Sequence, residues 1–200
     1  MDIKNKITNF LETGISSWTG ERIVRYPIRG NPVFLELLEL YKETLNYDNV
    51  TTFFECGTYN GNNAGDFSNV FEKVITAEVS KILWRNAVAT HRSKEKIIFL
   101  NGDATTELRK YLIGNPNERM VILLDDHVGH HSFIREELET IAKNSNADHI
   151  IIIDDVDQLG KGTYPPLEEI VELVNGMNER YVMERSNHKL LIYIPLEHNL

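Results

Sequence analysis

Apolar runs alternate with amphipathic segments through most of the chain. Five short runs rich in β-branched and aromatic residues predict strands, and each is followed by a segment that favours a helix. The runs are continuous rather than alternating, which is typical of a parallel sheet covered on both faces. The expected strands are 51–55, 73–78, 96–101, 120–125 and 149–154, and the expected helices are 62–70, 80–91, 105–113, 132–143 and 166–175.

The last two apolar runs break this alternation. Residues 180–185 and 189–194 are separated by three residues, a gap too short for a parallel crossover. They therefore predict an antiparallel hairpin. We expect an α/β fold that is Rossmann-like and doubly wound: a mostly parallel, seven-stranded sheet with a C-terminal antiparallel hairpin.

The first 48 residues follow a different pattern. Amphipathic periodicity predicts a helix over 3–12, and Asn31-Pro32 is a strong start for a second helix that runs to about residue 46. Arg22, Arg25 and Arg29 between them could face an anionic ligand, although a solvated loop explains them more simply. We expect residues 1–48 to form a helical, lid-like segment, and residues 49–200 to form the single globular domain.

Composition and charge narrow the function classes. The 200 residues are 42% hydrophobic and 26% charged, as in a soluble domain with a sizeable core. The net charge of −9 argues against non-specific nucleic-acid binding, and no apolar run is long enough to span a membrane. With Cys56 as the single cysteine, no intrachain disulfide can form. We expect a cytoplasmic protein with no nucleic-acid or membrane partner; the oligomeric state stays open, and a homodimer is possible.

A glycine turn follows the first expected strand. Gly57 and Gly61 frame a short polar segment that leads into the first expected helix. Such a turn suits a nucleotide-like ligand, because the glycines allow close approach and the start of a helix offers free N–H donors. Cys56 within this turn has no histidine near it in sequence, which favours a packing role over that of a nucleophile. An ordinary strand-to-helix turn has the same glycines, so this stretch alone leaves the function open.

Acidic residues stand at the ends of all five expected parallel strands. They are Glu55, Glu78, Asp103, Asp125 with Asp126, and Asp154 with Asp155. Ligands of open α/β sheets bind at the carboxyl ends of the strands, and solubility alone does not explain an acid at each one. Glu78 follows Gly57 by 21 residues, the spacing at which a carboxylate meets the ribose hydroxyls of a bound nucleoside. A surface glutamate is the alternative.

Asp125, Asp154 and Asp155 form a second constellation at the ends of the fourth and fifth strands. Three carboxylates there suit Mg²⁺ or another hard divalent cation, and without a counter-charge they would repel one another. Capped strand ends with repelling acids are the alternative. His127 follows in the next loop, with His130 and His131, and could act as a ligand or a general base.

These residues resemble a known family. The segments 55–61 (Glu-Cys-Gly-Thr-Tyr-Asn-Gly), 75–78 (Ile-Thr-Ala-Glu) and 101–104 (Asn-Gly-Asp-Ala) are similar to the cofactor motifs of class I S-adenosylmethionine-dependent methyltransferases. The terminal hairpin also matches that family's fold. Leu124-Asp125 and the segment 153–156 (Ile-Asp-Asp-Val) resemble the metal-dependent O-methyltransferases of catechol, caffeoyl-CoA and macrolide-sugar type. The resemblance covers about residues 50–195.

The resemblance implies methyl transfer from S-adenosylmethionine to a small hydroxylated acceptor, such as a sugar or glycan component, assisted by Mg²⁺ or another hard divalent cation. The residues that it places at the cofactor are Glu55, Gly57, Thr58, Tyr59, Gly61, Glu78, Gly102, Asp103, Ala104 and Asp125. Within this set, the glycine turn would hold the methionine part, Glu78 the ribose, and residues 102–104 the adenine. The metal ligands would be Asp125, Asp154 and Asp155.

The sequence departs from the catechol type at one point. Those enzymes carry a lysine base three residues after the first metal aspartate, and Val128 stands here. We therefore expect Asp125 and His127 to carry catalysis, with His127 as the base. An NAD-linked oxidoreductase is an alternative, although the glycine spacing is not Gly-x-Gly-x-x-Gly. A non-catalytic binding module of the same fold is another, against which the intact Glu78 and aspartates argue.

Overall fold

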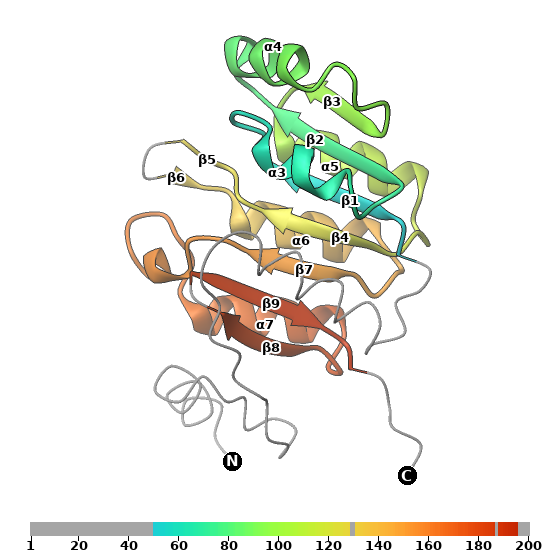
Figure 1. Ribbon diagram of the computed structural model, residues 1–200. Coiled ribbons are helices and arrows are strands. Elements are labelled where there is room, and N and C mark those ends of the chain that lie inside the picture. Colours follow the sequence, from blue (N-terminus) through green and yellow to red (C-terminus); the bar gives the residue numbers. More distant parts are fainter. Residues whose placement is uncertain (1–49, 129–130, 187, 196–200) are drawn as a thin grey trace.

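The computed structural model describes residues 50–128, 131–186 and 188–195. They form a seven-stranded sheet in the order β3-β2-β1-β4-β7-β9-β8 (Figure 1). Its strands are β1 (Thr52–Cys56), β2 (Lys73–Glu78), β3 (Ile97–Asn101), β4 (Met120–Leu124), β7 (Ile150–Ile153), β8 (Val182–Ser186) and β9 (Lys189–Tyr193). β9 pairs antiparallel with β7 and β8, and the other pairs are parallel. The predicted Rossmann-like fold with its C-terminal antiparallel hairpin is confirmed.

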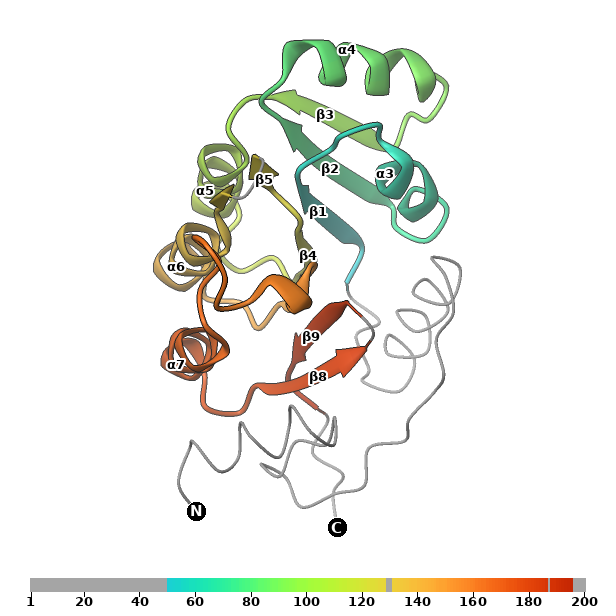
Figure 2. The ribbon, with the colours of Figure 1, turned by 90° about the vertical axis from the view of Figure 1, so that its left-hand side faces the viewer.

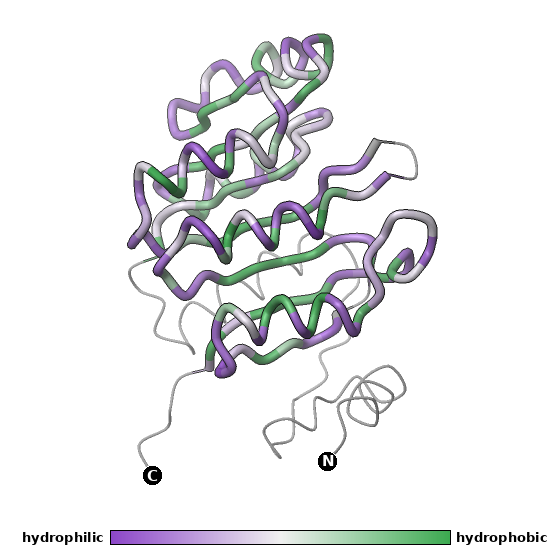
Figure 3. Tube along the Cα trace, turned by 180° about the vertical axis from the view of Figure 1, so that it is seen from behind, coloured by the Kyte–Doolittle hydropathy of each residue, from purple (hydrophilic) through white to green (hydrophobic). Residues whose placement is uncertain are grey.

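Helices lie on both faces of the sheet. α5 (Ala104–Gly114), α6 (Ile134–Asn144) and α7 (Leu167–Met177) lie side by side on one face, and α3 (Asn62–Phe67) and α4 (Lys81–Thr90) lie on the other side of the sheet (Figure 2). In Figure 3 the central strand β7 shows continuous apolar colouring, while apolar and polar residues alternate along the helices in front of the sheet. Each helix therefore buries one face, as its periodicity predicts.

The central strands explain the continuous apolar runs. β1, β4 and β7 are buried along their whole length. Phe54, Ile122 and Ile151 lie in register and pack into one core cluster, whereas the residues next to them in each strand pack into a second cluster on the opposite face. Because both faces are buried, the sequence shows no alternation of apolar and polar positions along these strands.

Two small elements extend the carboxyl edge of the sheet. A hairpin of β5 (His127–Val128) and β6 (His131–Ser132) follows β4, and a 3₁₀ turn, η1 (Val156–Gln158), follows β7 (Figure 1). No helix in the described ranges is both long and apolar enough to cross a membrane. The predictions for residues 1–48, including both helices and the three arginines, lie outside the described residues.

Candidate functional site

At the turn after β1, the backbone of Gly57 passes close to the backbone that follows β4. Gly57 has a φ of 91°, and a Cβ at this position would lie 2.6 Å from the backbone oxygen of Asp125. The amides of Gly57 and Thr58 both donate to the carbonyl oxygen of Ala77, at 3.2 and 3.1 Å. The turn therefore needs glycine next to β4, and these two amides bind β2 within the protein rather than a ligand.

The Glu78 carboxylate at the end of β2 is fixed by two backbone amides. Its Oε2 accepts from the Tyr59 amide at 2.9 Å, and its Oε1 accepts from the Ser80 amide at 2.8 Å. Tyr59 has a φ of 48°, a conformation that few non-glycine residues adopt. Each carboxylate oxygen keeps a second lone pair. The fixed carboxylate can therefore accept two further hydrogen bonds, as from the two hydroxyls of a ribose.

Glu55 lies beneath the glycine turn and is fully buried. Its Oε2 accepts from the Thr76 hydroxyl at 2.6 Å, and that hydroxyl is in turn 2.6 Å from the hydroxyl of Thr58. Its Oε1 has no hydrogen-bond partner in the described chain. Burial raises the pKa of Glu55 to about 8, although the hydrogen bond from Thr76 opposes the shift. Glu55 is therefore a neutral acid at pH 7 and lies beneath the glycine turn that follows β1.

The end of β3 is tied to the end of β2. The Gly102 amide and the Asn101 side chain both donate to the backbone oxygen of Glu78, at 3.1 and 2.9 Å. Asp103 caps α5, since its Oδ1 accepts from the Thr106 amide at 2.8 Å. The residues 102–104 thus lie beside Glu78. Glu55, Glu78 and Asp103, three of the predicted cofactor residues, therefore lie at the adjoining ends of β1, β2 and β3, whereas Asp125 follows β4.

Asp125, Asp126, Asp154 and Asp155 line one small pocket at the ends of β4 and β7, together with His127 and Tyr164. Leu124 and Ile153 are paired in the sheet. Asp125 and Asp154 are the next residues of the two parallel strands, so they lie side by side. Burial raises the pKa of Asp125 to about 7, and the charge of Asp154 adds to the shift. Burial also raises the pKa of Asp126 to about 6. This end of the site therefore holds closely spaced acids.

The predicted metal ligands line this one pocket, but they are not arranged to hold a metal ion. The Asp154 carboxylate binds the Lys189 ammonium, and its Oδ1 accepts from the Asp155 amide at 2.8 Å. The Oδ2 of Asp155 lies 3.6 Å from Nε2 of His127. Within the described ranges, no three His, Cys, Asp or Glu side chains are arranged to hold a metal ion. The residues therefore do not fit the expected Mg²⁺ site, because Lys189 already supplies the counter-charge that the metal was expected to supply.

Sequence analysis missed Lys189. β9 runs antiparallel beside β7, with Leu190 opposite Ile153, so the residue before Leu190 arrives at the end of β7 next to Asp154. The predicted hairpin contained this signal. Lys189 begins the last strand, β9. Because two antiparallel neighbours run in opposite directions, β9 begins beside the end of β7.

Sequence analysis also missed Glu137. This residue lies in the first turn of α6, is fully buried, and has no hydrogen-bond partner on either carboxyl oxygen within the described residues. Burial raises its pKa well above the ordinary value, and the negative charge of Asp126 adds to the shift. Its sequence neighbour Glu136 is exposed, so the sequence alone does not show which glutamate faces the core.

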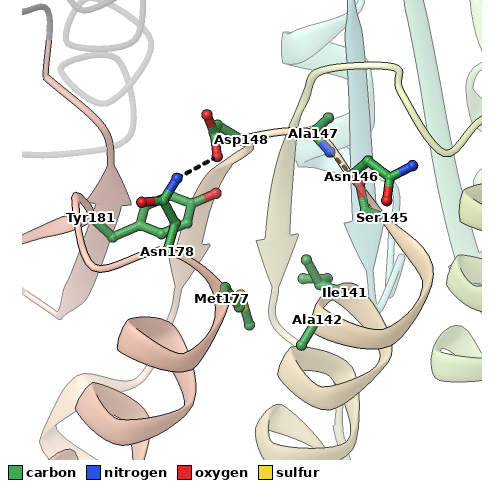
Figure 4. A pocket seen from close by; sticks show the side chains of 9 residues that line it. All are labelled: Ile141, Ala142, Ser145, Asn146, Ala147, Asp148, Met177, Asn178 and Tyr181. Carbon is green, nitrogen blue, oxygen red and sulfur yellow. Dashed lines mark hydrogen bonds between the residues drawn. The ribbon is translucent and has the colours of Figure 1, made fainter.

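A second pocket lies at the opposite edge of the sheet. It opens between the C-terminal ends of α6 and α7 and measures about 200 Å³ (Figure 4). The Asn178 side chain donates to Asp148 across it at 3.0 Å. None of the predicted site residues lines this pocket. The candidate site therefore remains the carboxyl edge of the sheet.

Comparison with known proteins gives the fold. No protein-family model matches the chain, and no curated protein matches it in sequence. A putative rRNA methylase from Clostridium thermocellum has 13% identity and a TM-score of 0.55, over 87% of this chain and 97% of that one. An O-methyltransferase family protein from Burkholderia thailandensis has 11% identity and a TM-score of 0.55, over 84% of this chain and 57% of that one.

A third similar structure contains a ligand. It is a putative methyltransferase from Streptococcus mutans in complex with SAH, with 12% identity and a TM-score of 0.53, over 86% of this chain and 99% of that one. At such identities the likeness concerns the fold. The chain shares the Rossmann-like fold of these methyltransferases.

Proposed function

We propose that this protein is an S-adenosylmethionine-dependent methyltransferase that acts on a hydroxyl group of a small acceptor, such as a sugar or glycan component. The observation that carries the proposal is Glu78, whose carboxylate is fixed by the Tyr59 and Ser80 amides beside the glycine turn. Its position at the end of the second strand of a Rossmann-like sheet supports a role as the acceptor of two ribose hydrogen bonds.

Charge supports a cationic donor. The ends of β1, β2 and β3, which we call the donor half, carry Glu55, Glu78 and Asp103. No salt bridge joins these acids to a cation of the described chain. A positively charged sulfonium nucleoside would offset the uncompensated charge of the Glu78 and Asp103 carboxylates, to which the protonated Glu55 adds none. A neutral nucleotide analogue would gain less, and an additional phosphate would be repelled.

The acceptor would lie at the ends of β4 and β7 and the start of β9, which we call the acceptor half. S-adenosylmethionine bound in the donor half would supply its methyl group: the new bond to the acceptor oxygen would form as the carbon–sulfur bond breaks, and the electron pair would stay on sulfur as a thioether. The hydroxyl proton passes to a base, for which His127 is our candidate. Its ring is partly exposed, and Asp155 at 3.6 Å would stabilise the imidazolium. Positioning of the two reactants supplies most of the remaining catalysis.

Metal assistance, which the resemblance to metal-dependent O-methyltransferases implies, is not proposed for this site. In the metal-dependent branch the cation binds the acceptor hydroxyl and lowers its pKa. Because Asp154 is paired with Lys189 here, the proposed reaction uses no metal ion.

Two other functions are weaker. An NAD-linked oxidoreductase is disfavoured by the antiparallel β9 and by the glycine spacing. Methylation of RNA has a precedent in the similar structures, two of which are described as rRNA methylases. The net charge of −9 opposes RNA binding, because affinity for the phosphate backbone depends on basic residues.

Calorimetric titration with S-adenosylmethionine tests the proposal. We expect saturable binding by the wild-type protein and a loss of at least about 100-fold in Glu78→Ala, since two hydrogen bonds to a charged acceptor contribute about 3 kcal/mol or more. Glu72→Ala is the matched control, because Glu72 is exposed in the loop that leads into β2. No binding by the wild-type protein would refute the proposed function. Unchanged affinity in a folded Glu78→Ala would refute the ribose assignment.

The acceptor class needs its own measurement. Formation of S-adenosylhomocysteine should be followed with hydroxylated sugars and with ribosomal RNA as competing acceptors. Turnover with a sugar and not with RNA is the expected result. Turnover with RNA alone would replace the small acceptor with a nucleic acid.

A further inference from the structure

The acidic loop after β7 is bound by basic side chains of the terminal hairpin. Lys189 binds Asp154 at the start of the loop, and Arg185 and His188 both bind Asp157 further along it. The backbone joins the same two elements, because the Val156 amide donates to the carbonyl oxygen of His188 at 2.9 Å. The hairpin therefore supplies a set of positive charges to the loop from which two metal ligands were expected.

The three basic residues are not equivalent. The side chains of Lys189 and Asp154 are 21% and 20% exposed, whereas that of His188 is 75% exposed. Water screens an exposed pair, so the contacts to Asp157 mainly fasten the loop. The pair of Lys189 and Asp154 is more enclosed, and the loss of one partner would leave the other charged and poorly solvated.

The sheet register places Lys189 next to Asp154 in the acceptor half. Asp154 follows Ile153, which pairs with Leu124 on one side and Leu190 on the other. Asp125 and Lys189 are therefore the residues that flank Asp154 on the two neighbouring strands. A single positive charge among Asp125, Asp154 and Asp155 relieves the repulsion that would otherwise draw in a divalent cation.

We propose that Lys189 is the resident cation of the acceptor half: its ammonium holds Asp154 and thereby prevents a divalent metal ion from binding Asp125, Asp154 and Asp155. Lys189 is then a positioning residue, which sets the charge beside the acceptor oxygen. The consequence for catalysis, namely methyl transfer without an added metal, rests on the proposed function. The consequence for metal binding does not.

Titration with Mn²⁺, with free Mn²⁺ followed by its electron paramagnetic resonance signal, tests the exclusion directly. We expect wild-type protein and Lys189→Arg, which keeps the charge, to bind Mn²⁺ only weakly. Lys189→Met should bind one equivalent at least tenfold more tightly, and a further Asp154→Asn change should abolish that gain. Lys143→Met, which removes an exposed lysine on α6, is the control and should behave like the wild type.

Two outcomes would overturn the proposal. Tight binding of one Mn²⁺ by the wild-type protein, lost in Asp154→Asn, would mean that the aspartates form a metal site despite Lys189. Equally weak binding by the wild type and a folded Lys189→Met would mean that Lys189 only fastens the hairpin. Circular dichroism confirms that each variant is folded.

An activity measurement separates this inference from the proposed function. Turnover should be unchanged by a chelator, and Lys189→Arg should retain more activity than Lys189→Met. A chelator that abolishes turnover would contradict the role of Lys189 and leave the methyltransferase proposal standing. If no S-adenosylmethionine binds at all, the proposed function fails, and the Mn²⁺ titration still decides whether Lys189 excludes a metal.

Discussion

The two halves of the carboxyl edge are both acidic, but they differ in how their acids are compensated. In the donor half, Glu55 and Glu78 accept hydrogen bonds from hydroxyls and backbone amides, and no described cation pairs with them. In the acceptor half, Asp154 pairs with Lys189, and Asp157 pairs with Arg185 and His188.

This difference indicates what each half requires from a ligand. Fixed acids without a counter-charge raise the cost of the empty site and favour a ligand that brings positive charge. Acids that are already paired gain little from a cation. The two halves look equally acidic in the sequence, but only the donor half is expected to favour a positively charged ligand. The following variants test this difference.

Gly57→Ala should have the largest effect, because Gly57 is where the two halves meet. Its φ is 91°, and an added Cβ would lie 2.6 Å from the backbone oxygen of Asp125. We expect the free energy of unfolding to fall by about 3 kcal/mol, from backbone strain and overpacking combined. Gly114→Ala, where no atom lies within 4 Å of the added Cβ, is the control. Equal stability of the two variants in urea unfolding would mean that β1 and β4 can separate without cost.

Glu55→Gln tests whether the donor half reduces stability. Glu55 has a pKa of about 8 in the folded protein and 4.5 as its ordinary value. Because the folded pKa is raised, the favourable contribution is full below pH 4.5 and is lost as the pH rises toward 8. Glutamine mimics the protonated acid, so Glu55→Gln should gain stability over wild type through that range, by about 2 kcal/mol at pH 6.

The comparison for Glu55→Gln is urea unfolding of both proteins at pH 4.5, 6 and 8. A difference that is constant with pH would show that Glu55 does not titrate in the folded state. The same variant should bind S-adenosylmethionine more weakly, since it removes a potential negative charge beneath the turn. Glu55 would then lower the stability of the protein without ligand and strengthen the binding of S-adenosylmethionine.

Lys189→Met tests the compensated half. Breaking the pair leaves Asp154 partly buried without its cation, and we expect the free energy of unfolding to fall by about 1–2 kcal/mol. Lys143→Met removes an exposed pair on α6 and should change stability by less than about 0.5 kcal/mol. Thermal unfolding of both variants provides the measurement. Equal, small effects would place the pair of Lys189 and Asp154 among ordinary surface contacts.

The fold could be predicted because long-range order follows from local apolar runs. Each central strand is buried on both faces, so its run is continuous and its ends are marked by polar residues. Glu78 could be predicted because its spacing from the glycine turn is set by one strand-helix-strand unit. The two-residue strands β5 and β6 are too short to show any periodicity.

The electrostatics of the site could not be predicted in the same way. The metal hypothesis counted the charges at the ends of β4 and β7 and omitted the first residue of β9, which the sheet brings to the same place. Charge balance depends on which strands become neighbours, and a list of acids along the sequence does not contain that information. The same limit applies to Glu137, since acids are favoured in the first turn of any helix whether or not they are buried.

Glu137→Leu should have the smallest effect and the opposite sign. Glu137 belongs to neither half: it lies fully buried in α6, with both carboxyl oxygens lacking a partner in the described chain. Replacing an unsatisfied buried acid with an apolar side chain of similar size should raise the free energy of unfolding by about 1 kcal/mol, a gain of about 2–4 °C in Tm. Glu136→Leu on the exposed face is the control. A lower Tm for Glu137→Leu, or weaker binding of S-adenosylmethionine, would instead make Glu137 part of the donor half.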